Sequence, residues 1–220
     1  WTSPTKLADQ VAVLDAHKEL SMVFSQILVR DEVSCRIFVQ PEIQPSRLAG
    51  GVAYFSSGDL AYNNLIGNFS SCIYRRSVIS AVPEVFYQTE AYDWLFNIFC
   101  GELGAIGCLP GVRTVYRQHR GGQWSSLSQS DKKLKTLSLI KQYDRLTNHR
   151  YRLEFKQHAR RLKRELRKIQ EQEWLDSIRW RRALVKRTKS VITIMRDTMP
   201  PLLFRALCLL VPPFIARYFH

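Results

Sequence analysis

The stretch MVFSQILV at residues 22–29 decides the fold class of this chain. It is rich in apolar and β-branched residues and stops at the charged triplet 30–32, which is typical of a strand buried inside a sheet. Residues 70–74 predict a second strand, which leads into a short helix through Val78 and Ile79. Strands that alternate with helices in this way predict a mixed α/β fold.

A helix is expected close to the first residue. Ser3-Pro4 supplies an N-cap residue followed by proline at the first helical position. Leu7, Val11 and Leu14 follow at helical spacing. These three residues mark one apolar face of the helix.

A further helix and two further strands are expected before residue 120. Residues 91–103 predict the helix, with Gly104 as the residue that ends it. Residues 106–109 and 112–116 predict the strands, and Pro110-Gly111 between them predicts a turn.

The composition excludes several classes of protein. The 220 residues are 45% apolar and 11% aromatic, which is too rich for a disordered chain, and ten Gly with nine Pro exclude fibrous and low-complexity chains. Five cysteines at irregular spacing form no CxxC pair. They predict buried free thiols in a reducing compartment such as the cytoplasm.

The net charge of +14 is distributed unevenly. Residues 1–128 hold 10 Lys and Arg against 11 Asp and Glu, a net charge of −1. Residues 129–220 hold 23 against 8, a net charge of +15, and no glycine. We therefore expect a nearly neutral α/β domain at 1–128, a basic helical extension at 129–198 and an apolar segment at 199–220.

The basic part has a helical pattern and no strand pattern. Two amphipathic helices are predicted, the first by Leu134, Leu137 and Ile140 and the second by Phe155, Leu162, Leu166 and Ile169. Within 199–220, only 11 residues separate Arg205 from Arg217, too few to span a bilayer, so we expect an interfacial segment. An anionic membrane surface would attract both parts of this tail, and nucleic acid or an acidic protein is the alternative partner.

Three stretches go beyond fold class: WTSPTKL at residues 1–7, IGNFSSCIYRRS at 66–77, and Tyr92-Asp93-Trp94 followed by VYRQHRGGQWS at 115–125. In order and spacing they resemble the family 2 glycosyltransferases of GT-A fold. The first resembles the segment after the acidic metal-binding motif, the second the strand beside the acceptor site, and the third the catalytic acidic motif with the closing segment. The resemblance implies a partial GT-A, Rossmann-like mixed sheet with flanking helices, followed by the basic all-helical extension.

The activity that this resemblance implies is the inverting transfer of a sugar from a nucleotide-diphosphate sugar to an acceptor hydroxyl. Asp93 matches the family's catalytic base, which removes the hydroxyl proton during the attack. The family commonly has Glu before this Asp, and Tyr92 stands there instead, so a second carboxylate contact is not carried over. The implied setting is cell-surface polysaccharide or glycolipid synthesis, with the protein in the cytoplasm or on the inner face of the membrane.

A divalent cation, Mn²⁺ or Mg²⁺, is implied as the group that neutralises the leaving diphosphate. His119 matches a histidine that can help to bind it, and the main acidic ligands are expected upstream of Trp1. Asp31-Glu32 follows a strand but stands at a different place from the family's acidic motif. The chain is therefore expected to be the C-terminal portion of a longer enzyme and inactive by itself.

The resemblance also assigns a set of residues to substrate binding: Asn68, Ser70, Ser71, Tyr92, Trp94, Arg117 and Trp124. Structural roles stay open for Trp94 and Trp124, since tryptophans often pack in a core. The same holds for Asp93, since an acid in the first turn of a helix is often solvated. The alternative function is a non-catalytic binding module whose basic tail binds nucleic acid or an acidic partner. A transferase remnant without activity is a third hypothesis.

Overall fold

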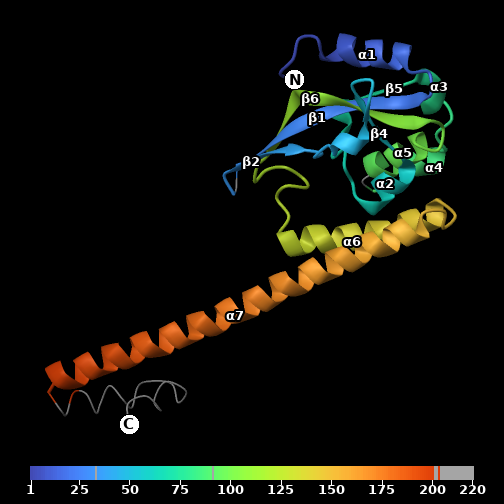
Figure 1. Ribbon diagram of the computed structural model, residues 1–220. Coiled ribbons are helices and arrows are strands. Elements are labelled where there is room, and N and C mark those ends of the chain that lie inside the picture. The colour runs from blue at the N-terminus through green and yellow to red at the C-terminus, as the bar shows by residue number, and fades with distance from the viewer. Residues whose placement is uncertain (33, 91, 201–202, 204–220) are drawn as a thin grey trace. The chain divides into compact units, whose positions relative to one another are not determined.

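The computed structural model describes residues 1–200 and 203, except residues 33 and 91. The chain forms two compact units, Trp1–Leu166 and Arg167–His220. The first unit contains a mixed sheet with flanking helices, which confirms the α/β class (Figure 1).

The sheet has six strands in the order β2-β1-β6-β4-β3, and β5 pairs with β1 outside this path. Strands β1 and β6 run parallel to each other, and the other pairs among the described strands are antiparallel. The strands are β1 (Leu20–Asp31), β2 (Arg36–Gln40), β3 (Leu48–Ala49), β4 (Val52–Phe55), β5 (Cys72–Tyr74) and β6 (Ala105–Gln118).

The strand predicted at residues 22–29 is confirmed as the middle of β1. It pairs with β6 along one edge, and with β5 and β2 along the other. Side chains of successive residues point to opposite faces, so Phe24 joins the main apolar cluster while Val23 joins a smaller one. Strand β1 is therefore buried on both faces, which explains its nearly continuous apolar sequence.

The helices cover the two faces unequally. Figure 1 shows α1 on one side of the sheet and α2, α4 and α5 on the other. Leu14 of α1 packs with Val23 in the smaller cluster, whereas α2, α3, α4, α5, α6 and the first turns of α7 pack with the sheet in the main cluster. The helices are α1 (Lys6–Ala16), α2 (Ser57–Tyr62), α3 (Arg76–Ile79), α4 (Glu84–Tyr87), α5 (Tyr92–Cys100), α6 (Gln129–Leu146) and α7 (Arg152–Thr198), with short 3-10 turns η1 (Pro45–Arg47) and η2 (Phe69–Ser71).

The buried face of α1 differs from the predicted one. The helix starts at Lys6 after Thr5, and not at Ser3-Pro4. Its buried residues are Lys6, Gln10 and Leu14, while Leu7 and Val11 are 44% and 46% exposed. Burial of this polar pair is tolerated because the two side chains bond to each other: the Lys6 ammonium donates a hydrogen bond of 2.8 Å to the Gln10 side-chain oxygen.

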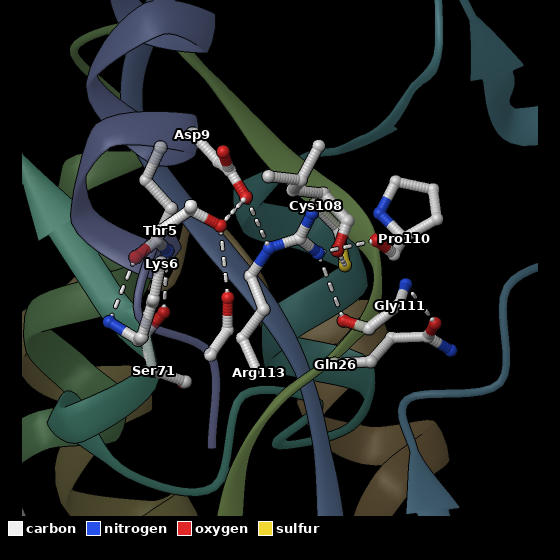
Figure 2. Close-up of polar contacts among 12 residues, drawn as sticks. Thr5, Lys6, Asp9, Gln26, Ser71, Cys108, Pro110, Gly111 and Arg113 are labelled. Atoms are coloured by element: carbon white, nitrogen blue, oxygen red, sulfur yellow. Dashed lines mark hydrogen bonds and ion pairs between the residues drawn. The ribbon is translucent and has the colours of Figure 1, made fainter. Parts of the chain in front are cut away.

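The prediction of a turn at Pro110-Gly111 is wrong, because β6 continues through these two residues as one strand. The two residues form an irregularity: Ser25 pairs with Leu109 and Gln26 with Val112. Figure 2 shows the contacts that hold it, in which the Gln26 side-chain oxygen accepts from the Gly111 N–H at 2.9 Å and Arg113 donates to the Pro110 carbonyl at 2.7 Å. Gly111 has φ +93°, which glycine adopts without strain.

Helix α5 confirms the helix predicted at 91–103 but ends earlier, at Cys100. The N–H groups of Glu102 and Leu103 then bond to carbonyls three residues back, which tightens the chain after the helix. Gly104 does not end the helix. A Cβ at Gly104 would lie 2.7 Å from the carbonyl oxygen of Glu19, so glycine is needed there for close approach to the start of β1.

Both helices predicted in the basic part are present as α6 and α7. The first unit continues to Leu166, because Tyr143 and Phe155 are buried in its main cluster. The change of charge at residue 128 is therefore a change of composition and not the edge of the packed unit.

Of the apolar segment expected at 199–220, residues 201–202 and 204–220 lie outside the described residues. None of the helices within the described part of the chain is long and apolar enough to cross a bilayer.

Candidate functional site

Asp93 lies in the first turn of α5, where its carboxylate is half-buried. Its Oδ1 accepts a hydrogen bond of 2.9 Å from the N–H of Trp94. Burial raises the pKa of the carboxyl, and bonds to backbone N–H groups offset part of that effect. No Lys or Arg of the described residues forms an ion pair with it. A carboxylate of this kind is able to accept a proton from a bound hydroxyl group.

Three tyrosines from different elements lie close enough to Asp93 to be affected by its charge. Its negative charge, added to the larger effect of burial, raises the pKa of Tyr74, Tyr116 and Tyr143. The Tyr74 hydroxyl donates to the Asn97 side chain at 2.7 Å, and the Tyr143 hydroxyl donates to the Glu90 carbonyl at 3.0 Å. The half-buried Tyr116 has no hydroxyl partner within the described part of the chain. The hydrogen-bonding capacity of this hydroxyl is therefore not used by another described residue.

The loop that precedes β5 comes to the same region. Phe69 packs edge-on against Phe96 of α5, with ring centroids 5.4 Å apart. The Cys72 thiol donates to the Asn68 carbonyl at 3.6 Å, and burial raises the pKa of that thiol to about 11, with a smaller contribution from Asp93. Phe69 of the predicted binding loop thus packs against the helix that carries the predicted base.

Within this loop, the three predicted binding residues differ in what they can offer. The Asn68 side-chain nitrogen is buried and has no hydrogen-bond partner among the described residues, whereas its oxygen accepts from Ser70 at 2.6 Å. Ser71 is fully buried and donates to the Asn68 carbonyl at 3.2 Å. Ser70 is exposed and can be reached by a ligand, whereas the buried Asn68 nitrogen and Ser71 belong to the interior of the loop.

A second polar group lies at the carboxyl ends of the parallel strands β1 and β6. Arg117 of β6 donates to Glu32 at 3.0 Å, just beyond β1. The pKa of Glu32 is lowered, first by this bond and to a smaller extent by the charge of His119. Ligands of open α/β sheets commonly bind at such carboxyl edges. In the sequence Glu32 stands apart from the place of the family's acidic motif, and in the structure it is the direct partner of Arg117.

The described residues do not supply a complete ligand set for the metal that the resemblance implies. The described residues contain no group of three or more His, Cys, Asp and Glu side chains that could hold an ion. His119 is exposed, and its own backbone N–H and carbonyl are occupied by the Ser125 hydroxyl. We therefore assign no step to a metal at these residues.

The two tryptophans assigned to substrate binding lie in different environments. Trp94 is 2% exposed, and its indole donates to the Leu60 carbonyl at 2.7 Å. Its ring packs edge-on against Tyr143 at 5.1 Å, so the assignment of Trp94 to a sugar contact is corrected to core packing. Trp124 is partly exposed, with the Lys135 ammonium 5.9 Å from its ring centroid. Tyr92 belongs to α5, but its side chain lies outside the described residues.

Comparisons with known proteins give relatives without an assigned function. The chain is 29% identical over 130 residues to the uncharacterized protein Mb1547 of Mycobacterium bovis and, at the same identity, to the uncharacterized protein MT1570 of Mycobacterium tuberculosis. The matched part covers 57% of this chain and 34% of each relative, so it spans about a third of their length. No protein-family profile and no solved structure matches the chain.

Proposed function

We propose that this chain is part of an inverting glycosyltransferase of family 2 type with a GT-A fold, which transfers a sugar from a nucleotide-diphosphate sugar to an acceptor hydroxyl. The observation that carries the proposal is the Asp93 carboxylate: half-buried, with a raised pKa, and without a cationic partner among the described residues. Structural acids near a surface are usually paired or solvated, whereas a general base must keep a free lone pair.

In the proposed reaction, Asp93 takes the proton of the acceptor hydroxyl as its oxygen attacks the anomeric carbon. The new carbon–oxygen bond forms on the face opposite the diphosphate. The bond between the anomeric carbon and the diphosphate oxygen breaks, and the diphosphate leaves with the electron pair. The Tyr116 hydroxyl would hold the acceptor beside Asp93, because it has hydrogen-bonding capacity that the described residues leave unused. The Asn68 amide nitrogen also has no partner among the described residues, but it is buried and would reach the acceptor only if its loop moved. Arg117 would meet the diphosphate only if its bond to Glu32 opens.

The proposed setting is the cytoplasmic side of cell-surface polysaccharide or glycolipid synthesis. A divalent cation bound with the donor would neutralise the leaving diphosphate. Of the described residues, His119 and Glu32 are the candidates to touch it, and they are too few to hold it.

The test uses the natural full-length protein with uridine, guanosine and thymidine diphosphate sugars and follows release of the nucleoside diphosphate. Asp93→Asn should lower turnover about 10²- to 10⁴-fold, the usual contribution of a general base, while donor binding stays within about twofold. Asp15→Asn changes an exposed carboxylate of α1 and serves as the matched control. Full turnover by the Asp93 variant would refute the base, and absence of turnover and of donor binding in the unaltered protein would refute the proposed function.

A further inference from the structure

The strongest unassigned feature of the first unit is a row of cations on α7, here called the basic stripe: Arg152, Lys156, Arg160, Lys163 and Arg164. All five side chains are exposed. Their spacing of four, four, three and one residues places them along one side of a helix over about 18 Å.

The opposite side of the same turns is buried. Phe155, His158, Leu162 and Leu166 are each less than 10% exposed, and Phe155 and Leu162 belong to the main core cluster. This packing fixes the rotation of the helix, so the stripe faces away from the core.

The charge of the stripe is not neutralised within the described residues. The two acids of this stretch lie elsewhere: Glu165 binds Lys133 of α6 at 2.5 Å, and Glu154 lies against Gly58 of α2. None of the five cations forms an ion pair with a described residue. Arg161, by contrast, has a structural role, because it donates to the Tyr62 carbonyl at 3.1 Å.

We propose that the basic stripe docks on a bilayer that contains anionic phospholipids. An unneutralised, single-sign row of cations is complementary to such a surface, and it would also fit nucleic-acid phosphates. The bilayer is favoured by the second unit, taken by itself, where Trp174 and Trp180 are 62% and 65% exposed and Val191 and Ile194 are also exposed. Exposed tryptophan and aliphatic side chains suit a membrane interface and are not required by phosphate contacts.

Vesicle sedimentation with the full chain tests this, using phosphatidylcholine with 30% phosphatidylserine and pure phosphatidylcholine as the probe membranes. Each basic residue close to such a surface is expected to contribute about a fivefold factor in partitioning, the equivalent of ~1 kcal/mol. Replacing Lys156, Arg160 and Lys163 by Gln should therefore reduce binding to the anionic vesicles roughly 100-fold. The unaltered chain should bind pure phosphatidylcholine far more weakly.

The matched control replaces three exposed cations outside the stripe, Lys18, Arg36 and Arg76, by Gln, with the same change in net charge. It should lower vesicle binding less than about threefold, because charges beyond a Debye length are screened. Circular dichroism and urea unfolding verify that both triple variants are folded. Equal losses in the two triple variants would overturn the proposal.

A gel-shift series with duplex DNA and single-stranded RNA separates the rival partner. Nucleic-acid binding that depends on the stripe, with no binding to anionic vesicles, would overturn the membrane proposal. Loss of vesicle binding in Trp174→Ala with Trp180→Ala, with any weak nucleic-acid binding unchanged, would support it. Membrane docking does not require glycosyl transfer, so each proposal can fail without the other.

Discussion

The Gln10 side-chain nitrogen donates a hydrogen bond of 2.8 Å to the carbonyl oxygen of Ser71, 61 residues further along the chain. The same amide accepts from the Lys6 ammonium at 2.8 Å. Lys6 is 1% exposed, and burial lowers its pKa. A polar chain therefore runs from α1 to the loop that carries Asn68 and Ser70, and it fixes the position of this loop beside α5.

We expect Gln10→Leu to destabilise the protein by roughly 2–4 kcal/mol. The substitution leaves a buried ammonium without its acceptor and the Ser71 carbonyl without its donor. A buried polar group that has lost its hydrogen-bond partner costs more free energy than the bond itself contributes to stability. Urea unfolding measures the change. Gln157→Leu, at an exposed position of α7, is the matched control and should change stability by less than about 0.5 kcal/mol. Equal effects of the two substitutions would mean that the buried amide has no special role.

The fold was predictable where the chain follows a simple rule of burial. Strand β1 is apolar because it is buried on both faces, and its sequence predicts it directly. The face of α1 was not predictable, because hydropathy assigns Leu7 and Val11 to the core and Lys6 to the surface. The continuity of β6 through Pro110-Gly111 depends on Gln26 and Arg113, whose contacts appear only after folding.

For the site, the position of Asp93 at the start of a helix follows from the sequence, but its environment does not. Its half-buried state depends on the packing of α5, in which Phe96 contacts Tyr74 of β5 and Trp94 contacts Tyr143 of α6. The ion pair between Glu32 and Arg117 joins residues 85 positions apart. A signal was available, since both residues close predicted strands, but sequence alone does not show that these strands are parallel neighbours.

The assignment of Trp94 to the core leads to a direct test. Trp94→Ala removes a buried ring and the donor to the Leu60 carbonyl, so it should cost about 3–5 kcal/mol. Trp174→Ala removes an exposed ring of α7 and should change stability by less than about 0.5 kcal/mol. Intrinsic fluorescence during urea unfolding gives both values. A Trp94 variant as stable as the Trp174 variant would contradict the core assignment and restore a ligand-facing role for this ring.

The buried His158 makes the stability of the first unit depend on pH. Burial, followed by the charge of Arg161, lowers the pKa of this imidazole to about 4, against an ordinary value near 6.5. Between these values the unfolded chain binds a proton that the folded chain does not, so stability falls as the pH drops from 6.5 towards 4, by up to roughly 3 kcal/mol. His158→Gln should remove this contribution, and the difference in unfolding free energy between the variant and the unaltered protein should change across that interval. His119→Gln, which replaces an exposed imidazole, is the control. Parallel stability curves for His158→Gln and the unaltered protein would show that His158 is free to take up its proton in the folded state.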